Sequence, residues 1–212
     1  MTNDASLVEQ LGNIDVYVFD QILRGRITPE MRILDAGCGT GRNVEYLIRQ
    51  GADVCAVDED AERVARVRAF AADHAAADPL PEENFRVESI GALSFPDASF
   101  DAVICCAVLH FSTDEAAFRT VLDEMFRVLR PRGLFFARLA SSIGIEDILE
   151  DGEGRWHRLP DGSRRFLVDA DFLRGEAERV GGELLDPIKT TVVDGARSMT
   201  TWVLRKTELR HD

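Results

Sequence analysis

Short apolar runs alternate with longer amphipathic stretches between residues 32 and 139. Each apolar run has the length of a β-strand, and each stretch between two runs carries apolar residues at the spacing of a helix face. The strands are expected at Arg32–Asp35, Asp53–Asp58, Phe85–Ser89, Phe100–Cys106 and Leu134–Leu139, and the helices at Asn43–Arg49, Ala61–His74 and Asp114–Leu129. Strands and helices that alternate in this way form βαβ units, which indicates a mostly parallel sheet.

The two ends of the chain depart from this alternation. Leu7–Arg24 has helical spacing and predicts one or two helices, with a break at Gly12 and Asn13. After Ala140, a turn signal at Pro160–Ser163 suggests a small hairpin. The remaining elements are the hairpin segments Trp156–Leu159 and Arg164–Val168, a helix at Asp171–Val180, and strands near Leu184–Val193 and Met199–Arg205. We therefore expect an α/β, Rossmann-like doubly wound fold, with a mostly parallel seven-stranded sheet, the last strand antiparallel, and helices on both faces.

Length and charge narrow the class of protein. A chain of 212 residues is expected to form one domain, 1–212, with residues 1–30 as an N-terminal helical cap. No apolar stretch approaches the roughly 18 uncharged residues of a membrane helix, and no signal peptide is visible, so a cytoplasmic protein with no membrane partner is expected. The net charge of −13 repels phosphate backbones and argues against a nucleic-acid partner.

Neither the cysteines nor the histidines suggest a metal site. No two of the 4 cysteines have C-x-x-C spacing, and all lie in or beside apolar segments, so buried free thiols are expected. The 4 histidines are scattered along the chain. The cysteines are Cys38, Cys55, Cys105 and Cys106, and the histidines are His74, His110, His157 and His211.

A glycine-rich turn, Asp35–Gly41, follows the first strand and precedes the first helix. An open parallel sheet binds its ligand at this place, and glycines let the backbone approach that ligand closely. The dinucleotide fingerprint requires a third glycine where this chain has Arg42. A Walker loop is also excluded, because no Gly-Lys-Ser/Thr follows.

Two aspartates restrict the ligand further. Asp35, at the mouth of the turn, would oppose a pyrophosphate and favour a ligand with an ammonium or sulfonium group. S-adenosylmethionine (SAM) carries both groups. Asp58 ends the second strand, where an acidic side chain accepts hydrogen bonds from ribose hydroxyls. Either aspartate alone could instead be a cap or turn residue, but both placements together favour a ligand site.

The chain resembles the class I SAM-dependent methyltransferases over about Ile14–Leu139. Ile33–Gly41 is similar to that family's first motif almost residue for residue, and Asp58 to its second. Leu93–Asp101 resembles the segment that enters the fourth strand, and Arg127–Gly133 resembles the turn before the fifth. A weaker similarity, in the residues Gly-Arg-Asn at 41–43, is to the tellurite-resistance-like small methyltransferases.

The resemblance implies SAM as the cofactor, S-adenosylhomocysteine as the product and no metal. Many relatives carry Asp where this chain has Ser89, so adenine recognition is expected to use the backbone of Ile90 as well. Arg132 replaces the first glycine of the usual Pro-Gly-Gly turn, which is expected to affect the turn alone. The residues expected to contact the cofactor are Asp35, Gly37, Cys38, Gly39, Gly41, Asp58, Glu59, Ser89, Ile90, Cys106 and Tyr17.

The acceptor end of the site is less defined by the sequence. His110 is the candidate general base, unless it packs or caps a helix, and Asp15 and Tyr17 could close over the methionine end of the cofactor. Residues 141–168 are expected to form a substrate lid, although a solvated hairpin with one packed tryptophan would show the same pattern. Arg138 either points into the acceptor space or pairs with a carboxylate elsewhere. The lid residues that could select an anionic or aromatic acceptor are Trp156, His157, Arg164 and Arg165.

We therefore expect methyl transfer from SAM to a small-molecule acceptor by direct displacement. One alternative is a catalytically silent sensor or scaffold that binds the cofactor with the same fold. A nicotinamide-dependent reductase is a weaker alternative, because the third fingerprint glycine and a Tyr-Lys pair are missing. A monomer or a homodimer is expected, and the acceptor atom stays open.

Overall fold

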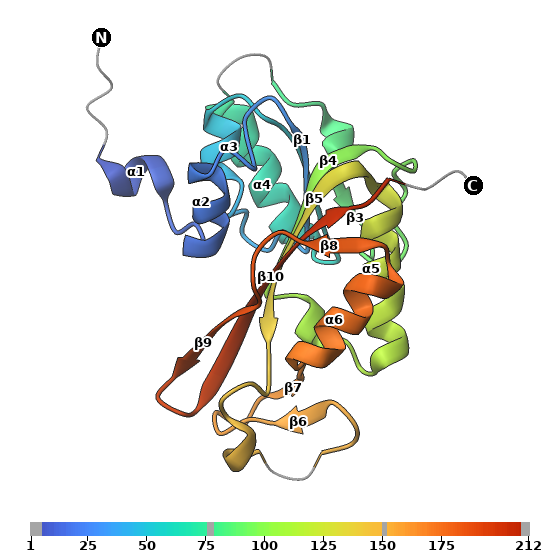
Figure 1. Cartoon of the computed structure of the whole chain (residues 1–212). Helices are drawn as coiled ribbons and strands as arrows, with labels where there is room; N and C mark the ends of the chain where they lie inside the picture. The colour runs from blue at the N-terminus through green and yellow to red at the C-terminus, as the bar shows by residue number, and fades with distance from the viewer. Residues whose placement is uncertain (1–5, 76–78, 150–151, 209–212) are drawn as a thin grey trace.

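A computed structural model describes residues 6–75, 79–149 and 152–208. Five parallel strands lie in the order β3-β2-β1-β4-β5, and β10 joins β5 in the antiparallel direction (Figure 1). The strands are β1 (Arg32–Ala36), β2 (Asp53–Asp58), β3 (Phe85–Val87), β4 (Phe100–Cys106), β5 (Leu129–Ala140) and β10 (Arg197–Lys206). This arrangement confirms the predicted Rossmann-like, mostly parallel sheet.

The sheet contains eight strands among the described residues, where seven were predicted. The single strand expected near Leu184–Val193 is divided into β8 (Gly182–Leu184) and β9 (Lys189–Val193), which both pair with β10. Pro187 lies between the two segments and has no backbone N–H to donate to a neighbouring strand. The interruption therefore divides the edge strand and leaves the topology unchanged.

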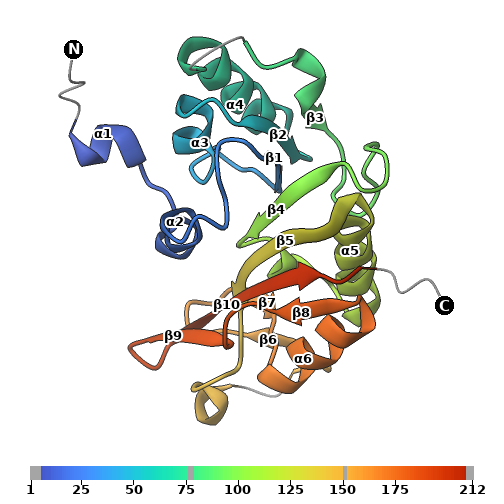
Figure 2. The ribbon, with the colours of Figure 1, turned by 45° about the horizontal axis from the view of Figure 1, so that its top comes forward.

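Two helix layers cover the two faces of the sheet (Figure 2). Successive strand residues point to opposite faces, so Ile33 and Ile104 pack under one layer while Leu34 and Val103 pack under the other. The first layer contains α2 (Val16–Leu23), α3 (Glu45–Arg49) and α4 (Ala61–His74), and the second contains α5 (Glu115–Val128) and α6 (Ala170–Arg179). A short helix, α1 (Leu7–Leu11), precedes α2, as the glycine at position 12 predicted.

Some element boundaries differ from the sequence prediction. The third helix begins at Glu45, two residues later than expected, because the turn after Gly41 continues to Val44. β5 begins at Leu129 and includes the segment predicted as a turn, where Arg132 takes a left-handed φ of 66°. This left-handed residue stands where the resembled family has a glycine, a residue type that adopts such angles without strain.

The segment after β5 forms the predicted hairpin. β6 (Trp156–Arg158) and β7 (Arg164–Phe166) pair antiparallel around the Pro-Asp-Gly-Ser turn, preceded by a short 3-10 helix, η3 (Glu146–Ile148). A bridge between Ser141 and Val168 joins this segment to the end of β5. In Figure 1 the hairpin lies below the end of β5, on the side toward which that strand points. No helix in the described residues is long and apolar enough to cross a membrane.

Candidate functional site

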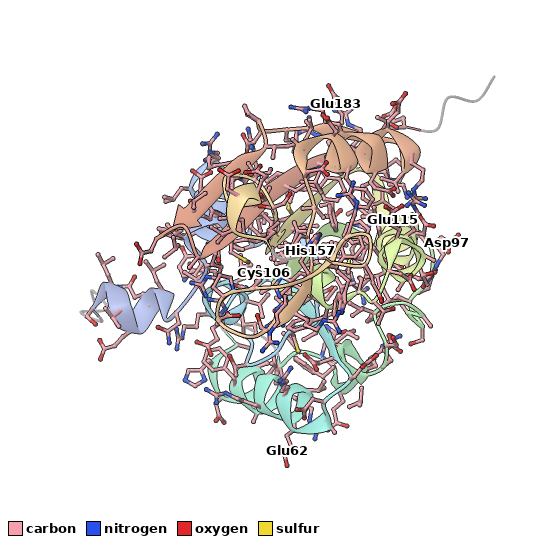
Figure 3. All side chains as sticks on the ribbon, turned by 90° about the horizontal axis from the view of Figure 1, so that it is seen from below. Glu62, Asp97, Cys106, Glu115, His157 and Glu183 are labelled. Carbon is pink, nitrogen blue, oxygen red and sulfur yellow. The ribbon has the colours of Figure 1, made fainter. Side chains whose placement is uncertain are left out.

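A cavity of about 550 Å³ opens at the carboxyl ends of β1, β2, β3 and β4. Open parallel sheets bind their ligands at this edge. Figure 3 views the molecule from this side, with Cys106 at the end of β4 and His157 of the hairpin near the centre. The lining residues are Gly37, Cys38, Gly39, Thr40, Arg42, Asn43, Asp58, Glu59, Arg63, Ser89, Ile90, Cys106, Ala107, Val108, Leu109, Phe111, Ser112, Thr113, Ala117 and Val121.

The glycine-rich turn forms one wall of the cavity because its backbone is left-handed at three positions. Gly37, Gly39 and Gly41 have φ values of 77°, 53° and 83°. A Cβ at Gly37 would lie 2.5 Å from a methyl carbon of Val108, and a Cβ at Gly41 would lie 2.9 Å from one of Val67. At Gly39 a Cβ would meet no atom within 4 Å, so this glycine faces open space. The turn therefore needs glycine for its backbone angles and, at two positions, for close packing.

Asp58 links the end of β2 to the turn. Its Oδ2 accepts the N–H of Gly39 at 2.9 Å, and its Oδ1 accepts the N–H of Asp60 at 3.0 Å. The carboxylate is mostly buried yet lines the cavity. Each carboxylate oxygen has a second lone pair, so Asp58 can still accept hydrogen bonds from a ligand hydroxyl.

Asp35 lies beneath the cavity, with only 1% of its surface exposed. No donor among the described residues reaches its Oδ2. Burial raises the pKa of this carboxyl to about 7, with Asp58 adding to the increase and Arg42 opposing it. A buried carboxylate oxygen without a donor is costly, and a cationic ligand would supply the missing partner.

An ion-pair network closes the end of the cavity near α2. Asp15 caps α2 and is buried, and its Oδ2 accepts a hydrogen bond from Arg138 at 2.6 Å. The backbone N–H of Asp15 donates to Asn43 at 3.1 Å, and the Arg42 guanidinium lies 3.9 Å from the same carboxylate. Of the two predicted positions for Arg138, the structure thus has the second, a pair with a carboxylate.

Tyr17 turns away from the cavity toward the C-terminal strands. Its hydroxyl and that of Thr191 are 2.7 Å apart, and its ring lies near the charged ends of Arg138 and Lys189. Tyr17 is not among the cavity-lining residues, so it fixes α2 against β9 in this conformation. Asp35 and Gly41 also lie behind the lining, whereas the other cofactor residues predicted from sequence line the cavity: Gly37, Cys38, Gly39, Asp58, Glu59, Ser89, Ile90 and Cys106.

The geometry argues against the general-base role predicted for His110. The side chain is buried, and its Nδ1 accepts the N–H of Ala140 at 3.2 Å, which occupies the lone pair of the neutral ring. Burial, together with the positive charge of Arg165, lowers the pKa of His110 to about 4. His110 therefore has no free lone pair to take a proton from an acceptor.

The predicted acceptor residues of the hairpin do not line the cavity. Trp156 is half-buried against the core, and the guanidinium of Arg164 lies 6.0 Å from the centre of its ring. His157 pairs with Arg165 across the hairpin and is likewise absent from the lining. Arg165, the fourth residue of that prediction, does not line the cavity either, but its guanidinium lies 4.7 Å from the ring centre of Phe111, which does.

Several lining residues were missed by sequence reasoning. Arg42 and Asn43 follow the turn directly in the sequence, and this position was a usable signal. Phe111 lies in a 3-10 helix, η2 (Leu109–Phe111), whose direction depends on the packing of the hairpin. Across the parts of the chain with described coordinates, no cluster of three or more His, Cys, Asp or Glu could hold a metal ion.

Comparison with known proteins agrees with this geometry. A family model described as a methyltransferase domain matches residues 34–137. A probable SAM-dependent methyltransferase of Mycolicibacterium smegmatis is 33% identical over 111 residues, which cover 52% of this chain and 38% of that protein. A ubiquinone biosynthesis O-methyltransferase of Methylocella silvestris is 39% identical over 107 residues, which cover 50% of this chain and 39% of that protein. The chain thus spans less than half the length of these two curated relatives.

Solved structures share the fold at low sequence identity. The PH0226 protein of Pyrococcus horikoshii superposes with a TM-score of 0.70 at 18% identity, covering 91% of this chain and 89% of that one. The 1,6-didemethyltoxoflavin-N1-methyltransferase of Burkholderia thailandensis, with bound S-adenosylhomocysteine, superposes with a TM-score of 0.66 at 20% identity, covering 94% and 79%. Over residues 34–137 the chain is thus similar to SAM-dependent methyltransferases, and its fold is shared with a solved methyltransferase structure.

Proposed function

We propose that this chain transfers the methyl group of SAM to a small-molecule acceptor by direct displacement. The observation that carries the proposal is the pair of aspartates at the cavity. Asp58 lines it at the end of β2, and Asp35 lies beneath it with an unpartnered oxygen. A carboxylate without a donor suits the ammonium of SAM, and an acidic residue at the second strand suits a ribose.

The remaining lining residues fit the other parts of the cofactor. Arg42 carries its charge beside Asp15 and Cys106, where it would bind the methionine carboxylate. Ser89 and the backbone of Ile90 lie at the far end of the cavity, where they would receive the adenine. The open space at Gly39 leaves room for the cofactor to lie against the turn.

SAM supplies a methyl group that is already activated by the sulfonium, so the chain mainly has to align the acceptor and exclude water. The ion pair between Asp15 and Arg138 ties the start of α2 to β5. Burial raises the pKa of the Cys106 thiol to about 12, so this thiol stays protonated and does not compete as a nucleophile. With His110 occupied, the acceptor's proton is released to water.

We propose a single domain, 1–212, in which 1–30 forms a cap and 141–168 a lid. A cytoplasmic monomer or homodimer, without a metal or a nucleic-acid partner, remains our expectation. The small-molecule acceptor is supported by the 1,6-didemethyltoxoflavin bound in the Burkholderia thailandensis structure, a likeness in fold alone.

A turnover assay distinguishes an enzyme from a silent cofactor binder. The protein is incubated with SAM deuterated at the methyl group and with a cell extract separated into low-mass, protein and nucleic-acid fractions. We expect deuterated methyl products in the low-mass fraction, lost in Asp35→Asn and kept in Asp171→Asn, a control at an exposed carboxylate. Label confined to protein or nucleic acid would contradict the small-molecule acceptor. Cofactor binding without any labelled product would favour the sensor or scaffold.

A further inference from the structure

The hairpin meets the cavity through one cation–aromatic contact. Arg165 of β7 is half-buried, and its guanidinium lies 4.7 Å from the centre of the Phe111 ring. Phe111 lines the cavity and has 56% of its surface exposed. The rim of the cavity therefore presents an aromatic surface next to a positive charge.

Arg165 forms no close ion pair among the described residues, although its charge contributes to lowering the pKa of the nearby Asp161 carboxyl. No carboxylate oxygen in the described residues lies within 4.0 Å of the guanidinium of Arg165, and its Nη1 donates to the carbonyl of Arg164. Arg155, at the base of the same hairpin, pairs with both Glu115 and Asp169. Among the described residues, Arg155 thus has two close carboxylate partners, whereas Arg165 has only the longer-range attraction of Asp161.

The rest of the hairpin adds to this positive potential. Arg158 and Arg164 lie directly opposite each other across β6 and β7, and both are exposed. Like charges at opposite positions destabilise a strand pair. Asp161 in the turn is the one carboxylate between Trp156 and Phe166, so this segment is positive in a chain whose net charge is −13.

We propose that Arg165 and Phe111 determine acceptor specificity by binding an anionic group attached to a planar ring. This inference rests on the proposed function and names the acceptor class, an aromatic carboxylate or a similar ring-borne anion. The guanidinium would donate to the anion, and the ring of the acceptor would pack against Phe111. In transfer, the carbon–sulfur bond breaks, the methyl carbon bonds to the acceptor's nucleophile, and the acceptor's proton passes to water.

Binding of a simple probe tests this inference without knowledge of the natural acceptor. Benzoate and benzamide have the same ring and differ in charge, so each is titrated by NMR into the protein loaded with S-adenosylhomocysteine. We expect benzoate to bind wild type in the millimolar range, tighter than benzamide. Arg165→Ala should weaken benzoate about tenfold, the loss of one charge-assisted contact, and leave benzamide unchanged. Arg165→Lys, which keeps the charge, should retain part of the affinity.

Arg158→Ala is the matched control, because it removes the same charge from an exposed position on the same hairpin. Equal binding of benzoate and benzamide to wild type would overturn the inference, as would equal losses in Arg165→Ala and Arg158→Ala. SAM affinity, measured in the same variants, keeps the two proposals separate. Normal SAM binding without discrimination between the probes refutes only the acceptor class, whereas absence of SAM binding by folded wild type refutes the proposed function and this inference together.

Discussion

The buried carboxyl of Asp35 should make the stability of the cofactor-free protein depend on pH in an unusual direction. Its pKa rises from an ordinary 3.8 to about 7 because burial penalises the charged form. A raised carboxyl pKa means that the folded state holds its proton more tightly than the unfolded state. The contribution of Asp35 to the free energy of unfolding is therefore complete below pH 3.8. It falls as pH rises toward 7 and stays at its low value above 7.

The size of this effect follows from the two pKa values. Each pKa unit corresponds to about 1.4 kcal/mol, so ionising Asp35 costs the folded state about 3 kcal/mol more at pH 8 than at pH 5. Asp35→Asn removes the titration while keeping the side-chain shape. The free energy of unfolding of wild type, minus that of Asp35→Asn, should therefore fall by about 3 kcal/mol across this range.

Urea unfolding at pH 5, 6, 7 and 8 measures this difference directly. Asp171→Asn, at an exposed carboxylate, should run parallel to wild type. The same titration predicts that SAM affinity falls about tenfold per pH unit below 7, since the protonated Asp35 no longer attracts the ammonium. Parallel stability profiles for wild type and Asp35→Asn would refute the claim that Asp35 is a buried carboxyl without a partner.

Two further variants test the packing of the site. Gly37→Ala should lower stability by about 1–3 kcal/mol in thermal unfolding and weaken SAM binding, because φ is 77° and the new Cβ would lie 2.5 Å from Val108. Gly25→Ala shares the left-handed backbone but meets no atom within 4 Å, so it should cost less, and equal losses would contradict the steric argument. Arg127→Ala should cost about 2 kcal/mol in urea unfolding, because Arg127 donates to the carbonyls of Leu93 and Phe95 and pairs with Asp97 and Glu124. Arg174→Ala removes only an exposed pair and should change stability by less than about 0.5 kcal/mol, so similar losses in both variants would contradict this assignment.

The sequence predicted the parts of the fold that depend on local patterns. The strands at Asp53–Asp58 and Phe100–Cys106 and the helix at Ala61–His74 have the predicted bounds, because apolar periodicity and capping residues define them within a few turns of chain. The edge strand was harder to predict. Pro187 interrupts its pairing with β10, but the chain runs in the same direction on both sides of this proline.

The cavity was predictable where its residues belong to the glycine-rich turn or to strand ends. Phe111 and Arg165 are in contact although more than 50 residues separate them in the sequence. This contact depends on how the hairpin packs against η2. The base role predicted for His110 also depended on a contact between residues distant in the sequence. The place of His110 after β4 suggested a base, but the N–H that occupies its nitrogen belongs to Ala140 at the end of another strand.

Isothermal titration with SAM and, separately, with NADH measures which of the two cofactors the cavity binds. We predict micromolar binding of SAM, loss of that binding in Asp35→Ala, and no binding of NADH. Failure of the folded wild-type protein to bind SAM, or preferential binding of NADH, would contradict this prediction.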